Sequence, residues 1–160
     1  MKEFYENGKI KFERNYFYVW KLYDIYGNLL FEGKYCGGKK NGQGKDYYKN
    51  GNLKFEGNYI NDRKINGKIY SYNGNEFYEI NNGKGTVKEY NDDDILEYEG
   101  EYFDGERGGI GKEYYENGKL KFEGKYLKGK RNGRGKEYYE NGKLKFDGEY
   151  LNGARNEKVI

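Results

Sequence analysis

The side chains that could support catalysis are scarce in this sequence. It contains no histidine, one cysteine (Cys36), one serine (Ser71) and one threonine (Thr86). A nucleophilic triad needs a base beside its nucleophile, and zinc sites are built mainly from histidine and cysteine. We therefore expect a protein that is not an enzyme, with no metal and no cofactor. Cys36 follows a tyrosine, as Ile60 and Leu127 do, and we interpret it as a small packing residue.

Acidic side chains gather in the middle of the chain. Residues 85–110 hold 9 acidic and 2 basic groups, whereas the whole chain has a net charge of +3. We expect no specific nucleic-acid partner, because such binding favours a continuous basic surface. Asp92, Asp93 and Asp94 offer oxygen ligands for calcium, but their spacing lacks the pattern of an EF-hand loop. We interpret them as a solvated acidic turn, with contact to a basic partner as the alternative.

Basic side chains concentrate near the C-terminal end, with six positive charges and no acid within twelve residues. They are Lys125, Lys128, Lys130, Arg131, Arg134 and Lys136. If the loops of successive repeats align, these groups form a basic ridge that binds anionic lipid headgroups. The alternative is that lysines in loops and at sheet edges keep molecules from pairing strand to strand.

Aromatic residues provide 19% of the chain, and 21 of its residues are tyrosine. Tyr47, Tyr114 and Tyr138 recur once per repeat, so their rings could contact a peptide or a single-stranded nucleic acid. The alternative is cross-strand packing of these rings against lysine. The apolar run that ends at Trp20 either caps the first hairpin or forms a partner-binding or self-association site.

An internal repeat organises these residues. Residues 111–130 read GKEYYENGKLKFEGKYLKGK, and residues 135–154 read GKEYYENGKLKFDGEYLNGA, 24 positions later. Residues 44–63 follow the same template. We expect one array of about seven units over the whole chain. The expected units are 1–20 (a cap or partial unit), 21–43, 44–66, 67–84 (degenerate), 85–110, 111–134 and 135–160.

Each unit has the pattern of a β-hairpin. Asn117-Gly118 stands between two runs of alternating polar and aromatic residues, and Asn-Gly favours a type I′ turn. With that turn, Tyr114 faces Lys121 and Glu113 faces Phe122, which makes one face of the hairpin aromatic and the other charged. The sequence therefore predicts an all-β fold: a single-layer, elongated antiparallel array of hairpins with no helices of note.

The repeat resembles the MORN repeat (membrane occupation and recognition nexus), whose pattern is Tyr-Glu-Gly-Glu-Trp, then Asn-Gly-Lys, then Gly-x-Gly. In one unit the matching positions are Phe122, Gly124, Tyr126, Gly133 and Gly135. The Asn-Gly-Lys-Leu-Lys turn looks like the variant common in bacterial and viral proteins. The resemblance recurs over most of the chain and departs from the pattern over residues 14–22 and 67–97.

The function that the resemblance implies is binding. MORN arrays occur as scaffolds, dimerisation modules and docking surfaces, and anionic phospholipid binding is proposed for some. We expect a protein-binding scaffold or docking module with a protein partner, and homodimers formed through the array ends. The alternatives are a peripheral membrane module that binds anionic phospholipid through the basic loops, and an antitoxin or inhibitor that occludes a partner enzyme. Without an apolar span or a signal-peptide core, we expect a cytoplasmic location, at a membrane surface in the first alternative.

Overall fold

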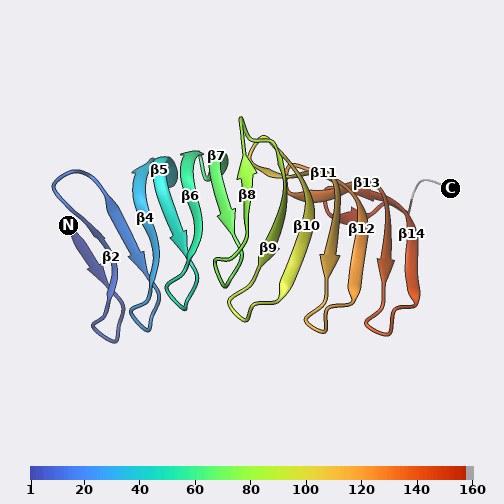
Figure 1. Cartoon of the computed structure of the whole chain (residues 1–160), viewed down its shortest axis with the longest axis horizontal. Helices are drawn as coiled ribbons and strands as arrows, with labels where there is room; N and C mark the ends of the chain where they lie inside the picture. The colour runs from blue at the N-terminus through green and yellow to red at the C-terminus, as the bar shows by residue number, and fades with distance from the viewer. Residues whose placement is uncertain (158–160) are drawn as a thin grey trace.

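A row of short strands makes up the fold, and Figure 1 shows them as successive hairpins with the two termini at opposite ends. The computed structural model describes residues 1–157. The strands are β1 (Lys2–Phe4), β2 (Ile10–Arg14), β3 (Trp20–Tyr23), β4 (Leu29–Cys36), β5 (Lys39–Tyr47), β6 (Leu53–Ile60), β7 (Arg63–Tyr70), β8 (Phe77–Ile80), β9 (Gly85–Tyr90), β10 (Leu96–Phe103), β11 (Glu106–Tyr114), β12 (Leu120–Leu127), β13 (Lys130–Tyr138), β14 (Leu144–Leu151) and β15 (Ala154–Arg155). The described residues contain no helix, and thus none that is long and apolar enough to cross a membrane.

The strands pair antiparallel in sequence order and form two open sheets, β1–β8 and β9–β15. A two-residue turn at Asn82-Gly83 connects the sheets between β8 and β9. The Gly83 amide donates a 2.7 Å hydrogen bond to the Ile65 carbonyl, and the Gly105 amide donates one of 3.0 Å to the Gly83 carbonyl. These bonds join the two sheets into one array. The predicted all-β array of antiparallel hairpins is confirmed, with the difference that it divides into two sheets.

The lower edge of the array in Figure 1 contains the loops with Asn7-Gly8, Asn50-Gly51, Asn73-Gly74, Asn117-Gly118 and Asn141-Gly142. Their geometry differs from the prediction. In the loop that joins β11 to β12, Gly118 has a φ of +77°, whereas the φ of Asn117 is negative. The Gly118 amide donates to the Tyr115 carbonyl at 2.9 Å. The Lys119 amide donates to the Asn117 side-chain oxygen at 3.0 Å, a contact that favours the right-handed conformation of asparagine.

This loop is a type I turn followed by a left-handed glycine, so the type I′ prediction is wrong. The extra residue of such a loop shifts the register of the hairpin between Glu113 and Tyr114. Tyr114 consequently pairs with Leu120 instead of Lys121. Beyond the shift, Glu113 pairs with Phe122, as the alternation predicted.

Type I′ turns lie at the opposite, upper edge of Figure 1, which we call the turn edge. In each of them both central residues have positive φ. They are Gly37-Gly38, Asn61-Asp62, Asn82-Gly83, Asp104-Gly105, Lys128-Gly129 and Asn152-Gly153. Successive turns are joined by backbone hydrogen bonds, for example from the Gly129 amide to the Arg107 carbonyl at 2.9 Å and from the Gly153 amide to the Arg131 carbonyl at 2.8 Å.

The core is a row of aromatic rings on one side of the sheets, which we call the inner face. The Phe122 ring is fully buried, and its centroid lies 5.6 Å from that of Tyr126 and 5.1 Å from that of Tyr150. The ring covers the facing pair Gly124 and Gly135. A Cβ atom on Gly124 would stand 2.6 Å from the Gly135 Cα and 2.8 Å from the Phe122 ring, so only glycine fits beneath the ring.

Candidate binding surfaces

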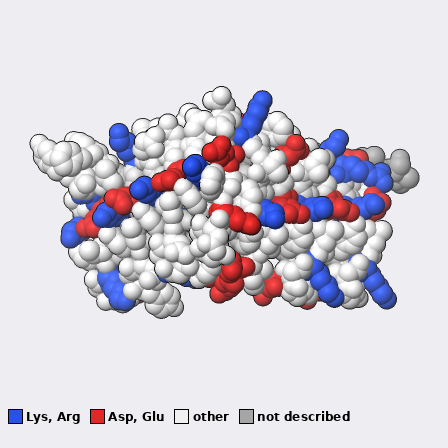
Figure 2. Space-filling view, in the orientation of Figure 1, with Lys and Arg blue, Asp and Glu red and all other residues white. Residues whose placement is uncertain are grey.

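Charged side chains of alternating sign cross both sheets on the face opposite the core, and Figure 2 shows them as rows of alternating blue and red. Each charge stands directly opposite a charge of the other sign on the neighbouring strand. The first sheet carries Lys2, Glu13, Lys21, Glu32, Lys45, Glu56, Lys68 and Glu79 in this order. The second sheet carries Lys88, Glu99, Lys112, Glu123, Lys136 and Asp147.

We call this arrangement the charge ladder. Each exposed cross-strand pair contributes less than about 1 kcal/mol, and its main effect is to favour one register over its neighbours. Within each sheet the positive and negative members are equal in number. The ladder face is therefore neutralised by its own side chains.

The predicted tyrosines Tyr47, Tyr114 and Tyr138 lie beside this ladder, half-buried. The Tyr114 hydroxyl donates to Glu99, and the Tyr138 hydroxyl donates to Glu123 at 2.6 Å. Burial and the Glu99 contact raise the pKa of Tyr114 to about 12, and for Tyr138 the Glu123 contact has the larger share of a similar rise. For Tyr47, burial raises the pKa of the hydroxyl. These contacts support the packing interpretation of the tyrosine series.

The six predicted basic residues do not form one continuous ridge. Arg131 points to the inner face, where its guanidinium lies 4.3 Å from the Phe122 ring centroid and its side chain is 16% exposed. Lys136 belongs to the charge ladder, and Arg134 lies 2.9 Å from Asp147 on the same face. The strand alternation and the register shift opposite Gly133 separate residues that the sequence places together. The exposed members at the turn edge are Lys125, Lys128 and Lys130.

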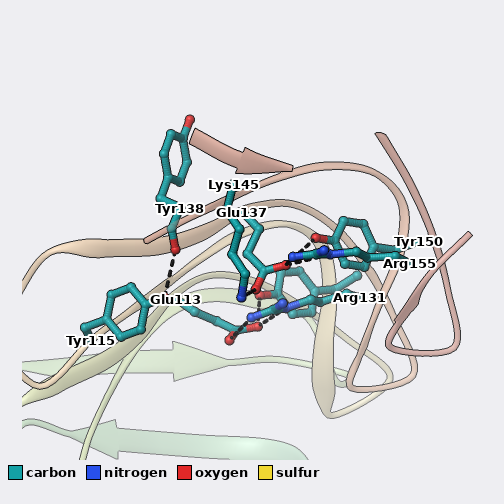
Figure 3. Close-up of polar contacts among 9 residues, drawn as sticks. Glu113, Tyr115, Arg131, Glu137, Tyr138, Lys145, Tyr150 and Arg155 are labelled. Atoms are coloured by element: carbon teal, nitrogen blue, oxygen red, sulfur yellow. Dashed lines mark hydrogen bonds and ion pairs between the residues drawn. The ribbon is translucent and has the colours of Figure 1, made fainter. Parts of the chain in front are cut away.

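Arg131 belongs to a cluster of polar residues on the inner face that the sequence analysis missed. Its guanidinium donates two hydrogen bonds to the Glu113 carboxylate, of 2.9 and 2.7 Å, and Tyr126 donates a third. Figure 3 shows Arg131 and Glu113 in this contact, with Arg155 and Glu137 beside them in the next repeat. Burial alone would raise the pKa of Glu113, but the hydrogen bonds from Arg131 and Tyr126 outweigh it and lower the pKa.

The same cluster recurs along the second sheet at fixed offsets. Each carboxylate accepts from a tyrosine 13 residues later and an arginine 18 residues later. The three sets are Glu89, Tyr102 and Arg107; Glu113, Tyr126 and Arg131; and Glu137, Tyr150 and Arg155. The recurrence of Glu and Arg 18 residues apart is a sequence signal that could have predicted them. The charges of all three arginines are paired, and Arg107 and Arg131 are largely buried, so these two act as packing groups in this fold, whereas Arg155 is exposed.

Trp20 lies at the opposite end of the array, in β3. Its ring is half-buried and lies 5.4 Å from Phe12 and 6.1 Å from Tyr35, centroid to centroid. These residues line a shallow, mainly apolar hollow of about 340 Å³ on the inner face. The adjoining loop carries Tyr16 and Phe17, which are 91% and 78% exposed. Trp20 thus packs on the first hairpins, while the loop before it is exposed.

Exposed apolar side chains recur at the turn edge, and one of them, Phe103, also packs over Gly109. One exposed residue stands immediately before most of the turns: Cys36, Ile60, Phe103, Leu127 and Leu151. We call them the turn-edge row. Cys36 is exposed, so the expectation that it is a packing residue is wrong. Tyr35 packs against Phe31 on the inner face, and strand alternation therefore directs the next side chain, Cys36, outward. Leu127 and Leu151 are each 56% exposed.

Comparison with known proteins agrees with this architecture. A family model described as a MORN repeat variant matches residues 1–17, 40–61, 107–128 and 131–152, together more than half of the chain. No curated protein matches the sequence. Each matched stretch contains one Asn-Gly loop of the lower edge: Asn7-Gly8, Asn50-Gly51, Asn117-Gly118 or Asn141-Gly142. With this coverage and this fold, the chain belongs to the MORN repeat variant family.

Proposed function

We propose that this chain is a non-enzymatic scaffold that binds a protein partner along the turn-edge row. The observation that carries the proposal is the recurrence of an exposed apolar side chain at one position of successive hairpins. Backbone hydrogen bonds between successive hairpins keep these positions along one edge of the array, so the side chains form a stripe that is interrupted at Asn81, before the turn between β8 and β9. Contiguous exposed apolar surface is a frequent mark of protein interfaces.

The other surfaces offer less to a partner. The charge ladder is neutralised by cross-strand pairs, and its tyrosines donate to ladder carboxylates. On the inner face, Phe122 and Tyr126 are buried, and Arg131 is held by Glu113. A partner that used these groups would first have to displace contacts that stabilise the hairpins. The turn-edge row needs no such displacement.

A pair of matched variants tests the proposed surface. Leu127→Glu combined with Leu151→Glu places two charges in the stripe, whereas Leu144→Glu introduces a charge at a site of equal exposure, 54%, near the lower edge. We expect affinity capture from the source cells to enrich a defined partner with the wild type and with Leu144→Glu, and to lose it with the double variant. Retention of that partner by the double variant would exclude the turn-edge row, and enrichment of no partner by the wild type would count against the scaffold function.

A second candidate function, the binding of anionic membranes, has one supporting observation. Lys125, Lys128 and Lys130 are exposed on either side of the exposed Leu127. Lysines near an anionic surface contribute about 1 kcal/mol each. In flotation with neutral and anionic vesicles, this function predicts salt-sensitive binding to anionic vesicles that is lost when the three lysines are changed to glutamate. Absence of binding at low salt would remove this candidate and leave the protein scaffold.

A further inference from the structure

One position on the inner face carries a cation in five of the hairpins. It is the residue paired with the last tyrosine before the turn, and its occupants are Lys40, Lys64, Arg107, Arg131 and Arg155. Each arginine of this series forms an ion pair with the glutamate 18 residues before it. At the same offset, Lys64 follows Asp46, whereas Lys40 follows Leu22. Lys40 is thus the member of the series that lacks a carboxylate of its own.

Lys40 uses the carboxylate of the next repeat instead. Its amine forms an ion pair with Asp46, and the Tyr59 hydroxyl donates to the same carboxylate. Within residues 1–157, the Lys64 amine has neither an ion pair nor a hydrogen bond, and its nitrogen lies 5.6 Å from the centroid of the Phe55 ring. Fully buried polar side-chain atoms in that part of the chain all have hydrogen-bond partners, so the Lys64 amine must reach solvent. Lys64 is therefore an unpaired but accessible amine on the inner face.

Lys64 lines a hollow of about 360 Å³ where the two sheets meet, the size of a site for a small ligand. The second sheet contributes Glu89, Tyr102 and Arg107 to the lining. Arg107 donates two hydrogen bonds to Glu89, of 3.1 and 2.7 Å, and Tyr102 donates a third of 2.6 Å. The Lys64 backbone amide donates to the Gly105 carbonyl at 3.2 Å, which holds this strand against the second sheet. The hollow is thus built from side chains that satisfy one another around a lysine that has no partner.

The surroundings of Lys64 favour its neutral form. Burial lowers the pKa of the Lys64 amine below the usual range of lysine. The carboxylates of Asp46 and Glu89 act in the opposite direction, and the cations Lys40 and Lys54 act in the same direction as burial. At neutral pH this amine is consequently deprotonated more often than that of an exposed lysine. The neutral amine is the form that attacks a carbonyl carbon.

We propose that Lys64 is a covalent binding site for small, uncharged aldehydes, which its amine takes up as an imine. The hollow limits the size of the ligand, and its lining of three acidic and three basic residues offers no large net charge to select a charged one. The amine nitrogen attacks the carbonyl carbon and forms a C–N bond. The resulting carbinolamine loses the carbonyl oxygen as water, together with both amine hydrogens, and a C=N bond remains. The step needs no oxidant or reductant, and water reverses it.

Reductive trapping on the full chain tests this site. Glycolaldehyde in limiting amount and sodium cyanoborohydride, added at neutral pH, convert each imine into a stable secondary amine, and peptide mass spectrometry measures the initial rate at every lysine. Lys40 is the matched control, because it holds the same position one repeat earlier but is paired with Asp46. Lys128 is the exposed control. We expect modification of Lys64 to be severalfold faster than that of both controls. A rate at Lys64 that does not exceed both would overturn the proposal.

Two variants supply a second measurement. Lys64→Arg keeps a cation at this position, as the arginine repeats do, and removes the amine, whereas Lys40→Arg makes the same change one repeat earlier. By intact mass, Lys64→Arg should lose the fast phase of adduct formation and Lys40→Arg should retain it. A fast phase that persists in Lys64→Arg would also overturn the proposal. Neither measurement involves the turn-edge row, so this proposal and the scaffold function can fail separately.

Discussion

Replacing Arg131 with alanine should destabilise the second sheet strongly. The change removes the bidentate contact with Glu113, whose side chain is 17% exposed, and the cation–π contact with Phe122. Loss of one partner from a buried ion pair costs about 3–5 kcal/mol, because the remaining charge stays buried without compensation. Since both side chains keep some solvent contact, we expect the lower part of that range, about 3 kcal/mol at neutral pH.

Arg134 provides a control on the same strand. It also forms an ion pair, with Asp147 at 2.9 Å, but its side chain is 66% exposed. An exposed pair of this kind contributes about 0–1 kcal/mol. Arg134→Ala therefore removes the same side chain and the same charge three positions away, at a cost of less than about 1 kcal/mol. The contrast isolates burial on the inner face as the cause of the larger effect.

Urea unfolding monitored by far-UV circular dichroism measures both variants. Because repeat arrays can unfold in parts, tryptophan fluorescence should be followed in parallel: Trp20 reports on the first sheet, whereas the change lies in the second. We expect Arg131→Ala to lower the dichroism midpoint far more than Arg134→Ala does. Equal losses for the two variants, or a loss below about 1 kcal/mol for Arg131→Ala, would refute the reasoning that the inner-face ion pair stabilises the fold.

Three further predictions concern pH, glycine packing and the tyrosine series. Burial alone would raise the pKa of Glu137, but hydrogen bonds outweigh it and lower the pKa to about 2. The free energy of unfolding that this shift contributes should be complete above the unfolded-state pKa of about 4.3 and should decline as the pH falls toward the folded-state pKa. Urea midpoints at about pH 6 and pH 3 should therefore differ less in Glu137→Gln than in the wild type. Gly124→Ala should lower the free energy of unfolding by more than about 2 kcal/mol, because its Cβ would meet the Gly135 Cα at 2.6 Å. Gly118→Ala has no neighbour within 4 Å, so in the same urea assay it should lose only about 1 kcal/mol, the cost of its positive φ. Tyr138→Phe should lower the free energy of unfolding by about 1 kcal/mol, because the hydrogen bond to Glu123 is lost, and should leave partner capture unchanged. Loss of capture would show that Tyr138 serves binding instead of packing.

The spacing of aromatic, charged and Asn-Gly residues along the chain was sufficient to predict the architecture. Alternating residues around a recurring Asn-Gly predict antiparallel hairpins, and the pairing of Glu113 with Phe122 follows from that alternation. The turn type could not be predicted from the dipeptide, because Asn117 accepts a hydrogen bond from the Lys119 amide and stays right-handed. The result is one additional loop residue, which changes the partner of Tyr114 but leaves the positions beyond the shift in place.

The candidate surfaces were harder to predict, because charge density along the chain does not tell which face a side chain occupies. Arg131 and Arg134 are three residues apart, yet one is buried against Phe122 and the other is exposed beside Asp147. A left-handed glycine between them, Gly133 with a φ of +93°, lies where the strand departs from regular pairing with β12. A count of six basic groups in twelve residues merges these two environments. The offset of 18 residues from a glutamate, which recurs from repeat to repeat, identifies Arg131 as the partner of Glu113 and thus distinguishes it from Arg134.

The aliphatic members of the turn-edge row differ from the other recurring features because about half of each side chain is exposed. Phe103 is the exception, since its ring also lies over Gly109. Inner-face rings cover glycine pairs, and ladder charges set the register, so each has a structural reason to recur. Ile60, Leu127 and Leu151 are 47%, 56% and 56% exposed, and before the type I′ turn at Asn82-Gly83 the equivalent residue is the polar Asn81. Exposed apolar side chains in a stripe also favour unwanted association, so they carry a cost in solubility. Their recurrence at this position therefore calls for a role outside the fold itself, and contact with a partner is the role that their chemistry suits.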